Sequence, residues 1–148
     1  DVARALTGEA LLEQARRYSL RVQPIQRAAP VLLHGPVAAR WLQREDGISD
    51  SQVLDAVRWH TTGSKGMGPV EKVVFLADKL DPLKATRYPY LERVRSLARE
   101  GLDQALLEFL NHELAYFLSR GHLIHPASLE LRNALMMAMG KLPTGLAQ

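Results

Sequence analysis

The chain has 148 residues, of which 47% are apolar and 24% are charged, a composition typical of one folded domain and not of a disordered segment. It contains no cysteine, which excludes disulfide bonds and thiolate metal sites, so any metal must be bound by His, Asp or Glu. No apolar run approaches the roughly 18 residues that span a bilayer. This excludes a membrane protein, and we expect a cytoplasmic location.

The net charge of +3 and the pI near 9.4 are mildly basic. The arginines are scattered along the chain and there is no Lys- or Arg-rich tail, so the charge is typical of solvated helix surfaces. We therefore do not expect nucleic acid as a partner. An anionic small substrate such as a nucleotide suits the same charge.

Helical periodicity runs through the sequence, and sustained strand alternation is absent. In the first part we predict a short helix to about residue 6, a helix over 8–19 capped by Thr7, an irregular segment over 21–33 because of Pro24 and Pro30, and a helix from Pro36 to about Arg44.

In the second part we predict a helix from a cap at Ser49 or Asp50 to His60, a helix from Pro69 to Leu80, two helices over 88–99 and 102–120, and a last helix over 126–139. The stripe of Leu131, Leu135, Met136 and Met139 is typical of a core face, and it leaves a homodimer interface open. The sequence predicts a single all-α domain over 1–148.

Three polar residues of metal-ligand type fall on the predicted apolar sides of these helices. Asp78 follows Val74 at helical spacing, His60 follows Ala56 in the same way, and His34 begins the Pro36 helix. A buried carboxylate needs a cationic or metal partner, and imidazole with carboxylate suits Fe, Mn or Zn. Taken singly, each residue also has a structural explanation: an ion pair for Asp78 and a helix-terminal role for each histidine. Spacing alone leaves both interpretations open.

The glycine-rich loop Thr62–Gly68 joins the His60 helix to the Asp78 helix. Its backbone N–H groups and Lys65 could cradle a phosphate beside a helix N-terminus. The loop is not a Walker A sequence, and it equally suits a plain connection between helices. For His112, His122 and His125, which lie late in the chain, we expect roles in the structure or in orienting metal ligands, and not metal ligation itself.

Five separated segments, in this order, resemble a known family: DVARAL at 1–6, LLHGPVAA at 32–39, RWHTTG at 58–63, EKVVFLADKLDP at 71–82, and LIHP at 123–126 with Arg132 and Asn133. They are similar to the YqeK-type HD-domain phosphohydrolases, the symmetrical bis(5′-nucleosyl)-tetraphosphatases. The resemblance covers nearly the whole chain. It implies an HD-domain-like helical bundle in which a metal-activated water hydrolyses diadenosine tetraphosphate to two ADP.

The resemblance also implies four metal ligands, Asp1, His34, His60 and Asp78, of which Asp78 and His60 are the catalytic residues. The implied metal is divalent: iron, in a mono- or dinuclear centre, with Mn or Zn as alternatives. Asp1 matches the second residue of the family's His-Asp doublet. We therefore expect the chain to be truncated at its N-terminus, without the upstream histidines and the helix or helices that carry them. Activity of the chain by itself depends on those missing ligands.

Charge and position near the motifs suggest five substrate-binding residues: Arg58, Thr61, Thr62, Lys65 and Arg87. Two other functions stay open. The first is an HD phosphohydrolase that acts on another nucleotide, such as a deoxynucleotide or an alarmone. The second is a non-catalytic helical module that binds nucleotides or associates with RNA.

Overall fold

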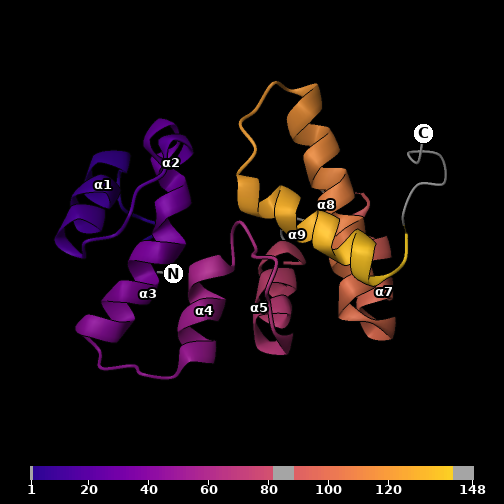
Figure 1. Cartoon of the computed structure of the whole chain (residues 1–148), viewed down its shortest axis with the longest axis horizontal. Helices are drawn as coiled ribbons and strands as arrows, with labels where there is room; N and C mark the ends of the chain where they lie inside the picture. The colour runs from indigo at the N-terminus through magenta and orange to yellow at the C-terminus, as the bar shows by residue number, and fades with distance from the viewer. Residues whose placement is uncertain (1, 82–88, 142–148) are drawn as a thin grey trace. The chain divides into compact units, whose positions relative to one another are not determined.

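The computed structural model describes residues 2–81 and 89–141, and the chain divides into two compact units. The first unit comprises Asp1–Thr62 and Met67–Asp78, and the second comprises Gly63–Gly66 and Lys79–Gln148. All regular secondary structure within the described ranges is helical (Figure 1), which confirms the all-α prediction. That the two units form a single domain stays a prediction.

The first unit contains the elements α1 (Gly8–Arg17), α2 (Pro24–Ala28), the 3-10 helix η1 (Pro30–Leu33), α3 (His34–Arg44), α4 (Ser51–Trp59) and most of α5 (Pro69–Lys79). Two predictions are wrong here. Residues 2–6 form turns and not a helix, and much of the segment over 21–33 is helical. Pro24 and Pro30 begin α2 and η1 at the first position, where the missing N–H of proline has no helical partner to lose.

The core of the first unit lies where α1, η1 and α3 meet. Leu11 and Ala15 of α1 pack with Leu33 of η1 and with Val37 and Ala38 of α3, and all five side chains are buried. Each fully buried leucine contributes about 1.5–3 kcal/mol relative to an exposed one. This core fixes the N-terminal end of α3, the end at which His34 lies.

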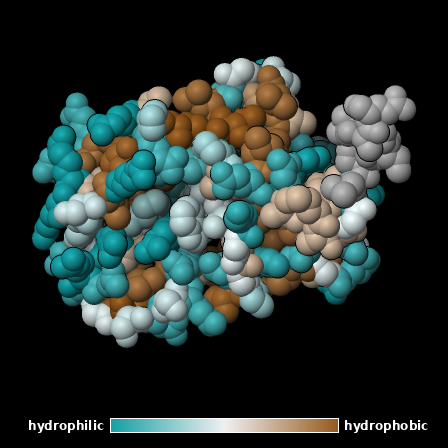
Figure 2. Space-filling model, viewed as in Figure 1, coloured by the Kyte–Doolittle hydropathy of each residue, from teal (hydrophilic) through white to brown (hydrophobic). Residues whose placement is uncertain are grey.

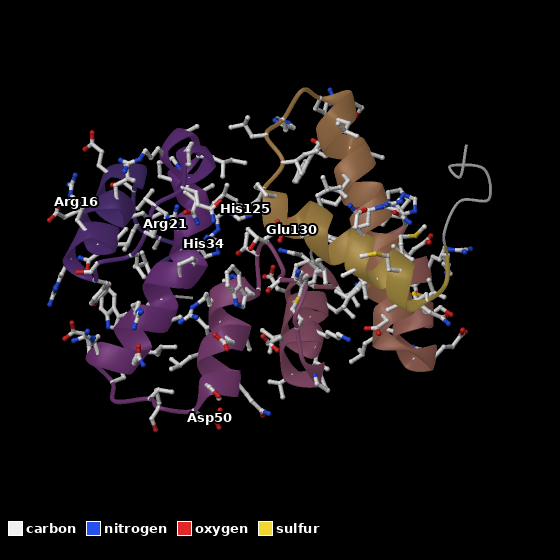
Figure 3. The ribbon with its side chains drawn as sticks, in the orientation of Figure 1. Arg16, Arg21, His34, Asp50, His125 and Glu130 are labelled. Atoms are coloured by element: carbon white, nitrogen blue, oxygen red, sulfur yellow. The ribbon has the colours of Figure 1, made fainter. Side chains whose placement is uncertain are left out.

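Helices α3 and α4 pack against each other and run in opposite directions (Figure 1). Asp50 caps α4, because its Oδ1 accepts hydrogen bonds from the backbone N–H groups of Gln52 at 2.8 Å and Val53 at 3.3 Å. Figure 3 shows Asp50 at the end of this helix pair opposite to His34. The N-terminus of α3 therefore lies beside the C-terminus of α4, which His60 follows.

The second unit contains α7 (Leu91–Glu100), α8 (Leu102–Ser119) and α9 (Pro126–Ala138), with α8 packed against both other helices. Its buried residues include Leu91, Val94, Leu106, Leu110, Leu131 and Leu135. Figure 2 shows hydrophobic surface over the C-terminal end of α8 and the loop that follows it, where Leu118 and Leu123 are exposed. Within residues 2–81 and 89–141, no helix has the length and apolar character that crossing a bilayer requires.

Candidate metal centre

The antiparallel pair of α3 and α4 brings His34 and His60 together. The two Nε2 atoms are 3.0 Å apart, and the ring centroids are 4.8 Å apart with an angle of 67° between the planes. His34 is 4% exposed and His60 is half-buried. Figure 3 shows His34 on the ribbon of α3. Two residues separated by 26 positions in the sequence thus converge on one point, as the sequence analysis expected.

The other ring nitrogen of each histidine faces a backbone carbonyl three residues earlier. His34 Nδ1 lies 2.5 Å from the oxygen of Val31, and His60 Nδ1 lies 2.7 Å from the oxygen of Val57. A carbonyl oxygen only accepts, so each Nδ1 carries a proton and donates it. In a neutral imidazole this leaves a lone pair on Nε2. Metal-binding histidines are held by this same kind of contact.

The two Nε2 atoms are in contact and both carry lone pairs, so a cation shared between them, either a proton or a metal ion, would relieve their repulsion. Two nitrogens that bind one metal at about 2.1 Å each must lie within about 4.2 Å of each other, and the separation found here meets this condition. Neutral imidazole suits zinc, iron, copper and nickel. The donor set formed by His34 and His60 therefore fits a divalent transition metal.

The predicted substrate-binding residue Thr61 contacts this pair: its hydroxyl is 2.9 Å from His34 Nε2, to which it can donate. Thr62 is buried. Arg58, which is partly buried, pairs with Asp55 of the same helix at 3.0 Å. Arg58 lies two residues before His60, and the ion pair joins its guanidinium to a carboxylate one turn earlier in α4.

Asp78 does not lie where the sequence analysis placed it. The residues predicted to share its inward stripe are exposed, Val70 by 42% and Val74 by 36%, and so is Asp78, whereas Phe75 and Leu76 are buried. Helix α5 carries apolar residues on two of its sides, so helical periodicity alone does not identify the buried side. The side with the larger Phe75 side chain is the buried one. In the part of the chain that the structure describes, no three His, Cys, Asp or Glu side chains form a group that could hold a metal. The predicted ligand Asp1 lies outside those residues, so a ligand set that includes Asp78 stays a prediction.

The remaining predicted residues are not part of this geometry. Asp1 and Arg87 lie outside the described residues. Lys65 is exposed and belongs to the second unit. At the end of the glycine-rich loop, the N–H of Gly68 donates to the Glu71 carboxylate. That amide is thus already engaged by an anionic group within the chain.

The sequence analysis missed the carbonyl oxygens of Val31 and Val57, which orient the two imidazoles. Every residue carries such an oxygen, so the identity of the side chains gives no signal for it. The common spacing of three residues between each oxygen and its histidine emerges only once the backbone geometry is known.

In the second unit, His125 has the structural role that the sequence analysis expected. It is 6% exposed and caps α9, with its Nδ1 accepting the N–H of Ala127 at 3.2 Å. Its Nε2 is buried without a hydrogen-bond partner. Burial lowers the pKa of His125 below its ordinary value, opposed in part by the Glu130 carboxylate.

Comparison with known proteins gives relatives that include symmetrical bis(5′-nucleosyl)-tetraphosphatases. No family model matches the chain. The chain is 36% identical over 107 residues to the symmetrical bis(5′-nucleosyl)-tetraphosphatase of Bacillus subtilis (strain 168), covering 72% of this chain and 56% of the relative. It is 36% identical over 121 residues to the protein of the same name from Halalkalibacterium halodurans, covering 82% of this chain and 64% of the relative. The chain thus spans about three fifths of the length of these relatives.

A solved structure shares the fold. It is a predicted HD superfamily hydrolase involved in NAD metabolism from Clostridium acetobutylicum, with a TM-score of 0.88 and 28% sequence identity, covering 93% of this chain and 72% of that chain. The prediction of an HD-domain-like helical fold is confirmed.

Proposed function

We propose that this chain, a relative of the symmetrical bis(5′-nucleosyl)-tetraphosphatases with the fold of an HD superfamily hydrolase, is the metal-dependent hydrolytic part of such an enzyme. Its substrate is a dinucleoside polyphosphate, and diadenosine tetraphosphate gives two ADP. The observation that carries the proposal is the His34–His60 pair, whose Nε2 atoms lie 3.0 Å apart. A purely structural histidine pair has no need of two Nε2 lone pairs that face each other.

We propose that His34 and His60 hold the metal through Nε2, and that Asp1 and Asp78 complete the ligand set. A bound divalent metal supplies Lewis-acid chemistry, which polarises a phosphoryl group and lowers the pKa of water. The carbonyls of Val31 and Val57 keep the protons of His34 and His60 on Nδ1. Each imidazole is therefore oriented before the metal or the substrate arrives, and no reorganisation is needed on binding.

Hydrolysis adds one water across the central phosphoanhydride. The water oxygen forms a bond to phosphorus, the bridging P–O bond breaks on the opposite side, and two nucleoside diphosphates leave with release of a proton. We propose that Arg58, two residues before His60 and oriented by its ion pair with Asp55, offers positive charge to the phosphates. Thr61 and Thr62 contribute hydroxyl donors. Lys65 and Arg87 remain predicted phosphate contacts.

The function is tested by metal content and product analysis. The protein is purified without chelating tags, its metals are measured by mass spectrometry, and turnover of diadenosine tetraphosphate is followed by chromatography. We expect about one or two divalent metals per chain and ADP as the sole product. Unequal products, ATP and AMP, would overturn symmetrical cleavage.

A panel of nucleotides separates the alternatives. Faster turnover of a deoxynucleotide or an alarmone than of diadenosine tetraphosphate would assign another substrate to the same site. A protein that binds nucleotides without metal and without turnover would be a non-catalytic module. Iron as the native metal, a homodimer and a cytoplasmic location remain predictions.

A further inference from the structure

Gly35 follows His34 in the first turn of α3 and is buried. A Cβ atom added to Gly35 would lie 2.7 Å from the carbonyl oxygen of Arg58 and 3.0 Å from that of Val57. Carbon and oxygen do not approach to 2.7 Å without displacement, and here the obstacle is backbone and not a flexible side chain. At this point, the backbone of α3 therefore rests directly on the last turn of α4.

One of these two carbonyls has a second contact. The oxygen of Val57 accepts the hydrogen bond from His60 Nδ1 at 2.7 Å. Carbonyls in the last turn of a helix have no regular intrahelical partner, which leaves them open to a side-chain donor. Gly35 thus packs against the Val57 carbonyl oxygen, which accepts the Nδ1 proton of His60. His34, the residue before Gly35, carries the Nε2 atom that contacts His60.

We propose that Gly35 is a positioning residue for the His34–His60 pair. Its missing side chain lets the N-terminus of α3 approach the C-terminus of α4 closely enough for the two Nε2 atoms to lie 3.0 Å apart while the Val57 carbonyl keeps its place. Glycine is the least favourable residue inside a helix after proline, so its presence in α3 calls for such a reason. The inference rests on the proposed function insofar as the pair binds metal.

The test uses Gly35→Ala with Gly101→Ala as the matched control. Gly101 has extended backbone angles with φ of −177°, and nothing lies within 4 Å of the Cβ it would gain. In metal-free protein, imidazole ¹⁵N–¹H spectra report which ring nitrogen of each histidine carries the proton. We expect Gly35→Ala to shift the His34 and His60 signals and to leave those of His112 unchanged. Gly101→Ala should leave the signals of all three histidines unchanged.

Titration with Co²⁺ alone, followed by its visible absorption, gives a second measurement. Loss of an outer-shell contact typically weakens metal binding about 10–100-fold. We expect a loss of this size in Gly35→Ala, with circular dichroism that matches the wild type, and wild-type affinity in Gly101→Ala. Wild-type imidazole signals and wild-type Co²⁺ affinity in a folded Gly35→Ala protein would overturn the proposal, even if the protein were less stable.

The imidazole spectra need no metal, so they distinguish the two proposals. If the wild type binds no Co²⁺ and hydrolyses nothing, the proposed function fails, and the His34 and His60 signals alone decide the role of Gly35. If Gly35→Ala does not fold, a crystal structure of the wild type still provides a test, since an ideal Cβ atom built on Gly35 should show a contact below 3.0 Å with the Arg58 carbonyl oxygen. Its absence would overturn the close approach on which the role depends.

Discussion

The His34–His60 pair in the first unit and His125 in the second differ in what the backbone presents to Nδ1. In the pair, carbonyl oxygens of Val31 and Val57 receive the Nδ1 protons. At His125, the N–H of Ala127 donates to Nδ1. A neutral imidazole has one proton, so the first arrangement leaves a lone pair on Nε2 and the second leaves an N–H there.

This difference shows how the backbone around a histidine can suit it either to metal binding or to a structural role such as helix capping. A lone pair on Nε2 can bind a metal, whereas an Nε2–H cannot. The partner of Nδ1 thus decides the role of each histidine before any ligand arrives. Each backbone group that faces Nδ1 belongs to the local helix geometry: a carbonyl three residues earlier, or an N–H at the start of the next helix.

The largest effect should come from removal of one member of the pair. His60→Ala or His34→Ala should weaken Co²⁺ binding by more than about 100-fold, beyond the range for outer-shell contacts, and abolish turnover of diadenosine tetraphosphate. Calorimetric titration and chromatography measure the two losses. The control is His122→Ala, whose exposed side chain lies in the second unit, and it should keep wild-type affinity. Equal losses in all three variants would refute a special role for the pair.

A smaller effect is expected at Asp78. Asp78→Asn removes the negative charge, and if the carboxylate completes the ligand set, metal affinity should fall about 10-fold or more. Because Asp78 is exposed, unfolding in urea should change by no more than about 0.5 kcal/mol. Removal of a buried charge can stabilise a fold, but the exposed carboxylate of Asp78 offers no such gain. Unchanged affinity and turnover in Asp78→Asn would show that His34 and His60 work without this carboxylate.

His125 should affect stability and not metal binding. His125→Ala removes the cap of α9 and should lower the free energy of unfolding by about 1 kcal/mol, with further loss from the cavity left by the ring. His125→Asn keeps a capping acceptor and should recover part of that loss. Urea unfolding gives the free energies, and Co²⁺ titration should give wild-type affinity for both variants. A drop in affinity would mean that His125 contributes to the metal site after all.

The smallest effect should be the pH dependence that His125 contributes. Its pKa is lowered by burial in the folded protein, so as pH falls below about 6.5 the unfolded chain takes up a proton that the native protein does not. Stability should therefore fall with decreasing pH in that window, by at most about 1.4 kcal/mol per pH unit, and be unaffected above it. The difference in unfolding free energy between wild type and His125→Asn, measured at pH 7.5, 6.5 and 5.5, isolates this contribution. A constant difference would contradict it.

The sequence by itself determined most of the helices. Caps at Thr7 and Asp50 and the start of α5 at Pro69 were predicted where the structure has them, because these signals act within one turn of the chain. The motifs also identified His34 and His60 as partners through family resemblance. The helical pattern gave the wrong buried side on α5, because two sides of this helix carry apolar residues at helical spacing. The side with Asp78 is exposed, and Phe75 is buried.

Tertiary structure alone decided the chemistry of the histidines. Which nitrogen carries the proton depends on the backbone atom opposite Nδ1, and which Nε2 atoms meet depends on how closely α3 approaches α4. Residue types and their spacing do not set the Nε2 separation, because it joins segments 26 residues apart. They also do not show which backbone atom faces Nδ1, because every residue carries the same backbone groups. The sequence predicted His34 and His60 as ligands, and the tertiary structure places their Nε2 atoms 3.0 Å apart, where the backbone of Gly35 lies against two carbonyl groups of α4.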